Sequence, residues 1–175
     1  GAGVIGLSSA IRLQEAGFEV EIWAAELTPG TTSDKAAAFW YPFHVLPIDQ
    51  AAVWGEASFK TLTAIAGEPR TGVEMEPTTI VFEDETEDPP WAGYIPDFHR
   101  PDPDELPDGY VTAYWFTTPV AEMPVYMAYL MDRFQQNGGT VVQRMLISLE
   151  EALAECPLVV NCTGLGSRSL VGDDR

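Results

Sequence analysis

The amino-acid sequence opens on a Gly-x-Gly-x-x-Gly spacing, formed by Gly1, Gly3 and Gly6. In a turn that binds the pyrophosphate of a dinucleotide, the first glycine allows the tight turn, the second lets the backbone approach the phosphates, and the third lets the following helix pack closely. Such a turn normally follows a buried strand, and no residue precedes Gly1 here. We therefore expect a fragment of a nucleotide-binding fold that lacks its first strand.

The residues after the turn continue the pattern. Apolar side chains recur at helical spacing over residues 4–16, and Gly17 stands where a left-handed cap would end a helix. Apolar and acidic side chains alternate over residues 18–23, which is typical of a strand. Glu26 follows Gly6 by 20 residues, the spacing of an acid that accepts hydrogen bonds from a ribose. This combination favours a dinucleotide-binding unit over a glycine-rich loop before an ordinary helix. Glu26 alone also fits a solvated strand end.

The charge of the chain restricts its partners. The 175 residues have a formal net charge of −18, which repels nucleic acid and anionic membrane surfaces at long range. An anionic cofactor must then be held locally, by backbone N–H groups. The two cysteines are too few for a disulfide framework and fit a reducing compartment. We predict no nucleic-acid partner, no membrane partner and a cytoplasmic location, or a peroxisomal one in a eukaryote.

Residues 46–117 differ in character from the segments on either side. They are rich in proline and acidic residues, with strand-like composition at 78–82 and 110–116 and helical spacing at 51–66. The acidic runs are typical of solvated loops, so we expect no metal site. Two histidines stand apart from any cluster of ligands and are given no role: His44 and His99.

The helix and strand pattern returns after this excursion. Residues 124–136 and 149–155 have helical spacing, whereas 140–144 and 158–162 are typical of strands, the last of them a buried type that delivers Thr163 at its end. Ligands bind at the carboxyl ends of strands in open α/β sheets, so this strand end is a candidate binding position.

The alternation sets the expected domain organisation. We predict an α/β fold in which residues 1–45 and 118–175 form a discontinuous, Rossmann-like cofactor domain. Residues 46–117 are expected to be the first part of a second, β-rich (α+β) substrate domain that is inserted into the first.

Four segments, taken in order, resemble the D-amino-acid oxidase family of FAD-dependent oxidases. The segment GAGVIGLSSA is shared by many FAD and NAD proteins. The run of hydroxyl and alanine residues in TPGTTSDKAAAFWYPF and the Asn-Cys-Thr-Gly in LVVNCTGLGSR are more specific to the family. The segments span almost the whole chain: GAGVIGLSSA, TPGTTSDKAAAFWYPF, GYVTAYWFTTPVAEMPVYMAYLMDRF and LVVNCTGLGSR.

The resemblance implies an FAD cofactor and names residues for it. The pyrophosphate would be held by Gly1, Gly3, Val4, Ile5 and Gly6, and the ribose would be contacted by Ala25 and Glu26. The phosphates or ribityl chain would be contacted by Thr32 and Ser33, and the flavin by Ala37, Ala38 and Phe39. The adenine would be contacted by Leu146, and Thr163 would approach the cofactor from the later strand end. Tyr41 would lie near the substrate pocket.

The resemblance also implies an activity, the oxidative deamination of D-amino acids to 2-oxo acids with ammonia and hydrogen peroxide. Its partners would be an amino-acid substrate and oxygen, and a homodimer is left open. We expect no catalytic residue within the chain, because the family's carboxylate-binding Arg and Tyr would lie beyond Arg175. The alternatives are an oxidase of glycine, D-aspartate or another amine, an NAD(P)-dependent dehydrogenase, and a catalytically incompetent nucleotide-binding fragment.

Overall fold

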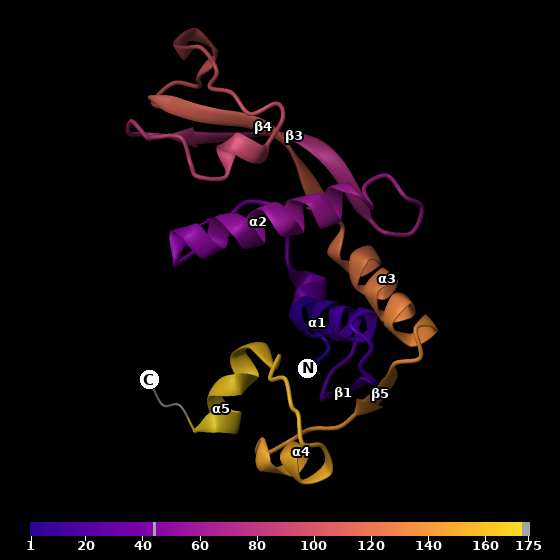
Figure 1. The fold of residues 1–175 in the computed structure, drawn as a ribbon. Coiled ribbons are helices and arrows are strands. Elements are labelled where there is room, and N and C mark those ends of the chain that lie inside the picture. The colour runs from indigo at the N-terminus through magenta and orange to yellow at the C-terminus, as the bar shows by residue number, and fades with distance from the viewer. Residues whose placement is uncertain (44, 173–175) are drawn as a thin grey trace. The chain divides into compact units, whose positions relative to one another are not determined.

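The computed structural model describes residues 1–43 and 45–172 (Figure 1). His44, which was given no role, and Arg175, beyond which the substrate-binding residues are expected, lie outside the described residues. The chain divides into two compact units, unit 1 with Gly1–Ala37 and Met123–Arg175, and unit 2 with Ala38–Glu122. The assignment of the first to the cofactor and of the second to the substrate stays a prediction.

Two helices of unit 1 end on the same glycine motif. In α1 (Val4–Glu15) and α3 (Met123–Gln136) the backbone leaves the helix through a glycine of positive φ, +90° at Gly17 and +85° at Gly138. The N–H groups of each glycine and of the residue after it bond to carbonyls that the last helical turn leaves free. Each motif therefore ends its helix and directs the chain into the following strand.

Those strands pair with each other. β1 (Glu21–Ala24) and β5 (Thr140–Gln143) run parallel, in register from Glu21 opposite Thr140 to Ala24 opposite Gln143. Their helices also meet, since α1 contacts α3 and the Arg133 guanidinium lies 2.6 Å from the Glu15 carboxylate. Unit 1 thus contains two helix–strand segments side by side (Figure 1). Its buried apolar side chains include Leu7, Ala10, Ile11, Ile22, Met127, Leu130 and Phe134.

Unit 2 is built on an antiparallel sheet in the order β2 (Ala38–Phe39), β4 (Thr112–Ala121), β3 (Val73–Phe82). The helix α2 (Ile48–Thr63) packs against β3 and β4. The indole N–H of Trp40 anchors that helix, since it donates to the Gly55 carbonyl and the Ser58 hydroxyl. The buried core is mostly aromatic: Trp40, Phe59, Trp91, Ile95, Tyr114 and Phe116.

One expected strand is absent, so the prediction for residues 158–162 is wrong. The segment between the short helices α4 (Glu150–Glu155) and α5 (Ser167–Val171) contains no strand. Leu158 is 62% exposed and Val160 is 52% exposed, against the buried type that was expected. A strand is stabilised by a neighbouring strand, and among the described residues no strand pairs with this segment.

Candidate cofactor site

The three opening glycines differ in the atoms that a side chain at each position would meet. A Cβ on Gly1 would lie 2.2 Å from the Cys162 carbonyl oxygen, and a Cβ on Gly6 would lie 1.9 Å from the Gly1 carbonyl oxygen. Both positions exclude any side chain, so the turn itself requires them. A Cβ on Gly3 would meet the Ser33 hydroxyl oxygen at 3.0 Å, a tight contact with a side chain rather than with backbone. The sequence explained Gly6 by helix–sheet packing, whereas the structure shows packing on the backbone of Gly1.

The N-terminus of α1 has the donor set of an anion site. Gly3 is its N-cap and provides no side-chain cap, and the first turn contains no acidic residue although the chain has 27 of them. The Val4 N–H donates to the Ser33 hydroxyl oxygen at 3.0 Å. The first N–H groups of a helix have no partner within the helix and lie at the positive end of its dipole. These residues fit a phosphate group.

The loop of residues 28–34, which reaches the first turn of α1 through Ser33, contains an interaction that sequence reasoning missed. Thr32 is exposed and Ser33 is half-buried, as their predicted contacts with a ligand require. Thr31 and Asp34 beside them are buried and bonded to each other, the Thr31 hydroxyl donating to the Asp34 carboxylate at 2.6 Å. The sequence feature that could have indicated this bond is a hydroxyl residue, Thr31, three positions before an acid, Asp34. This spacing favours local hydrogen bonds between side chain and backbone.

Thr163 lies beside the glycine turn, although the strand that was predicted to deliver it is absent. A Cβ on Gly1 would come within 3.1 Å of the Thr163 Cα atom. Its N–H and hydroxyl both donate to the Asn161 side-chain oxygen, at 3.2 and 2.7 Å, and its hydroxyl lies 2.9 Å from that of Ser167. Asn161 was missed, although an Asn two residues before a Thr is a recognised turn former. This polar turn, rather than a strand, places Thr163.

The predicted ribose contacts follow β1. The Ala25 carbonyl accepts a hydrogen bond from the Gln143 side chain at 3.0 Å, which ties this position to β5. The Glu26 side chain is exposed. The structure thus leaves the Glu26 carboxylate accessible at the carboxyl end of β1, where an acid that binds a ribose is expected.

Arg144 is a second feature that sequence reasoning missed. Its guanidinium lies over the Trp23 ring at 4.4 Å from the centroid and pairs with Glu155 at 2.8 Å and Glu151 at 3.5 Å. The hydrogen bond that Arg144 donates to Glu155, with the charges of both acids, raises the pKa of Arg144 above its ordinary value. Leu146, the predicted adenine contact, follows two residues later and is half-buried.

The remaining predicted residues adjoin or belong to unit 2. Ala37 is the last residue of the first segment of unit 1, whereas Ala38 and Phe39 form β2. The Phe39 and Tyr41 rings stack at 5.9 Å, and Tyr41 stacks on Phe43 at the same separation. Burial, and then the neighbouring Tyr114, raise the pKa of the Tyr41 hydroxyl. Tyr41 therefore stays a neutral hydrogen-bonding group.

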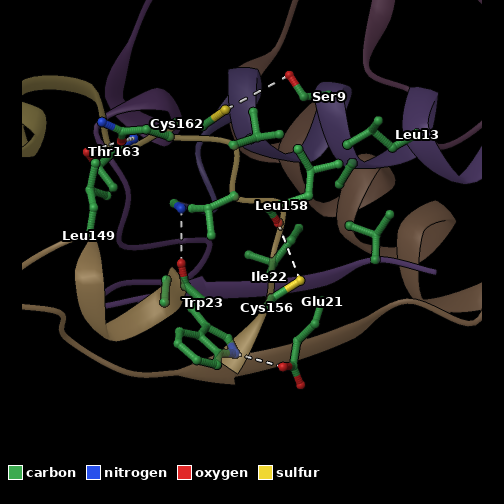
Figure 2. Close-up of a pocket in the computed structure, with 18 of the residues that line it drawn as sticks. Ser9, Leu13, Glu21, Ile22, Trp23, Leu149, Cys156, Leu158, Cys162 and Thr163 are labelled. Carbon is green, nitrogen blue, oxygen red and sulfur yellow. Dashed lines mark hydrogen bonds between the residues drawn. The ribbon is translucent and has the colours of Figure 1, made fainter. Parts of the chain in front are cut away.

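A cavity of about 630 Å³ opens inside unit 1 (Figure 2). It lies between α1 and β1 on one side and residues 146–163 on the other. Figure 2 shows the Trp23 carbonyl at its wall, where the Gly1 amino group donates to it at 3.0 Å. Four predicted cofactor residues line the cavity, which is otherwise mostly apolar: Gly1, Gly6, Leu146 and Thr163. The backbone N–H groups suited to an anion are therefore at the α1 N-terminus rather than in the depth of this cavity.

Residues 1–43 and 45–172 lack two other kinds of feature, a metal-binding cluster and a membrane-spanning helix. This part of the chain has no group of three or more His, Cys, Asp or Glu residues that would hold a metal ion. It also has no helix with the length and apolar character needed to cross a membrane. His99 pairs with Trp115 through backbone bonds and ring contact, so its place is structural.

With this geometry established, comparison with known proteins decides the family. The sequence model of the DAO family, described as FAD dependent oxidoreductase, matches residues 1–175. The chain belongs to this family. FAD is thus the cofactor of the family, and the match selects it over the NAD(P) that the opening motif alone allowed. The predicted resemblance is confirmed.

Individual relatives agree with the family. The chain is 42% identical to the D-amino-acid oxidase of Rubrobacter xylanophilus, over 99% of this chain and 53% of that protein. Identity to the D-amino-acid oxidase of Dictyostelium discoideum is also 42%, over 99% of this chain and 51% of that protein. Identity to the D-aspartate oxidase of Homo sapiens is 35%, over 100% of this chain and 54% of that protein. The chain spans about half the length of the curated relatives it matches.

Solved structures confirm the fold class. A glycine oxidase from Bacillus cereus matches with a TM-score of 0.57 at 21% identity, over 82% of this chain and 44% of that one. An L-amino acid deaminase from Proteus vulgaris matches with a TM-score of 0.60 at 17% identity, over 81% of this chain and 37% of that one. At these identities the likeness shows the fold alone, an α/β Rossmann-like arrangement with a β-rich companion.

Proposed function

We propose that the protein containing this chain oxidises D-amino acids to 2-oxo acids, with FAD as cofactor and oxygen as the final electron acceptor. The observation that carries the proposal is 42% identity to two D-amino-acid oxidases over 99% of this chain. The 35% identity to a D-aspartate oxidase keeps D-aspartate as a second substrate to be tested. In the balanced reaction an amino acid, an oxygen molecule and a water give a 2-oxo acid, ammonia and hydrogen peroxide.

The described residues support the cofactor half of the proposal. The α1 N-terminus offers main-chain N–H groups without an acidic residue in its first turn. Bound FAD would accept the hydride from the substrate α-carbon, so the chain itself need supply only binding and orientation. We propose these FAD contacts: Gly1, Gly3, Val4, Ile5, Gly6, Ala25, Glu26, Thr32, Ser33, Ala37, Ala38, Phe39, Leu146 and Thr163.

The aromatic row of unit 2 supports the substrate half. Phe39, Tyr41 and Phe43 stack in sequence, and Phe39 and Phe43 remain 47% and 63% exposed. Large exposed apolar side chains that are stacked together mark a binding surface more often than scattered ones do. We propose that Tyr41 contacts the substrate from this row.

An absorption spectrum and a peroxide assay test the proposal. The protein produced from its complete gene should show flavin absorbance and release FAD on heating. It should form peroxide with D-alanine and not with L-alanine, and parallel assays with D-aspartate and glycine rank the substrates. A purified protein without flavin, or one that forms peroxide from glycine or L-amino acids only, would overturn the proposal.

A further inference from the structure

We propose that Asp34 is a positioning residue for the cofactor site, because its carboxylate closes the loop that sets Ser33 against the first turn of α1. The proposal rests on the proposed function, since it assumes that FAD binds at this turn. The Asp34 carboxylate bonds within its own loop and is not proposed to contact the glycine turn or the cofactor. It acts through its neighbour in the sequence.

The Asp34 carboxylate is fully used inside its own loop. Asp34 is 7% exposed. One carboxylate oxygen accepts the Thr28 hydroxyl at 2.6 Å, and the other accepts the Thr31 hydroxyl at 2.6 Å and the Thr31 N–H at 2.9 Å. Burial acts to raise the pKa of Asp34, but these hydrogen bonds outweigh it and lower the pKa below its ordinary value. The charged form therefore closes the loop from residue 28 to residue 34.

The closed loop fixes the position of Ser33 against the first turn of α1. Its hydroxyl oxygen accepts the Val4 N–H at 3.0 Å, across 29 positions of sequence. A hydroxyl that accepts one bond still has its own hydrogen to donate, so Ser33 can donate to a phosphate oxygen at the same turn. Without a fixed loop, Ser33 would lose conformational entropy on binding, and the cofactor would have to compensate for that loss.

The closure also solves an electrostatic problem. A carboxylate one residue from Ser33 and two from Thr32 would repel a phosphate bound there if its oxygens faced the phosphate. Here the three hydrogen bonds that the carboxylate accepts all come from Thr28 and Thr31 within the loop. The hydroxyl of Ser33, rather than the charge of Asp34, is presented to α1.

A double-mutant cycle distinguishes positioning from a purely structural role. Asp34→Asn keeps the size of the side chain but replaces one acceptor by an NH₂ group. We expect FAD dissociation constants to rise about tenfold in Asp34→Asn and in Ser33→Ala, the effect of losing one hydrogen bond to a charged group. If Asp34 acts through Ser33, the double variant should be no weaker than the weaker single variant, since coupled residues are not additive.

Two further variants keep the test decisive. Asp97→Asn is the matched control, because Asp97 also accepts a backbone N–H, that of Thr117 in β4 at 3.2 Å, but belongs to unit 2. It should leave FAD affinity unchanged. Thr28→Val removes a single donor to Asp34 and should shift affinity in the same direction by less, even if Asp34→Asn folds poorly. Full additivity of Asp34→Asn and Ser33→Ala would overturn the proposal.

A measurement without FAD separates this proposal from the function. Hydrogen exchange of the Val4 amide in the FAD-free protein should be faster in Asp34→Asn and Ser33→Ala and unchanged in Asp97→Asn. Faster exchange in a protein that never binds FAD would defeat the proposed function and support the positioning role. Normal FAD binding by the wild type, with Val4 exchange unaffected by Asp34→Asn, would defeat the positioning role alone.

Discussion

At the residue scale, the three glycines of the turn differ in the atoms that an added side chain would contact. Gly1 and Gly6 face backbone atoms, at 2.2 and 1.9 Å from where a Cβ would stand, so a side chain there would break the turn. Gly3 faces the Ser33 hydroxyl, and its φ of −73° is accessible to any residue. Only at Gly3 does a substitution test binding rather than folding.

Gly3→Val should therefore lower FAD affinity while the protein still folds. The branched side chain would press on Ser33 and cover the N–H groups of the first turn of α1. We expect the FAD dissociation constant, measured by flavin fluorescence, to rise at least about a hundredfold, as expected when several hydrogen bonds to a charged group are lost together.

The matched control is Gly93→Val. A Cβ on Gly93 meets no atom within 4 Å, and its φ is not positive. Its FAD affinity and melting temperature should equal those of the wild type. Wild-type affinity in Gly3→Val would show that the cofactor does not approach this turn.

At the scale of elements, the sequence predicted most of the helices and strands because their ends are chemically marked. Gly17 and Gly138 both take the positive φ that only glycine adopts without strain, so the helices before them were bounded correctly. The apolar spacing of residues 124–136 predicted α3, which begins at Met123. In each case the signal was local.

Failures occurred where composition and spacing do not identify the partner of a segment or a side chain. Residues 158–162 have the composition of a buried strand, but strand pairing is decided by a neighbour that composition does not reveal. The network of Thr28, Thr31 and Asp34 was missed because spacing alone does not say which hydroxyls turn inward. The stacking of Arg144 on Trp23 joins the residue after β5 to β1, which is far away in the sequence.

Substitution of Phe134 tests how much the packing of α3 contributes to the stability of unit 1. Its ring is fully buried, and a Cβ on Gly139 would stand 2.3 Å from it. We expect Phe134→Ala to lower the free energy of unfolding by about 3–5 kcal/mol, the usual cost of removing a buried aromatic ring. Phe18→Ala, at a position 53% exposed, should cost less than about 1 kcal/mol. Urea unfolding compares the two, and equal losses would contradict the packing shown here.

At the scale of the whole molecule, the charge is far from balanced. The chain has 27 acidic and 9 basic side chains, which gives it a formal net charge of −18. Exposed ion pairs such as Lys60 with Glu56 contribute only about 0–1 kcal/mol each. Repulsion among the remaining acids destabilises the folded state, because folding brings like charges closer together.

Added salt should therefore stabilise this protein. Sodium chloride shortens the screening length from about 10 Å at 0.1 M to about 3 Å at 1 M, so the repulsion fades over this range while the exposed pairs lose little. We expect the melting temperature to rise with salt, by about 2–4 °C for each kcal/mol of repulsion removed. Neutralising the exposed run Glu83, Asp84 and Glu85 as Gln, Asn and Gln changes the net charge from −18 to −15 and should reduce the slope. A melting temperature that falls with sodium chloride, or an unchanged slope in the neutralised variant, would show that ion pairs rather than repulsion dominate its electrostatics.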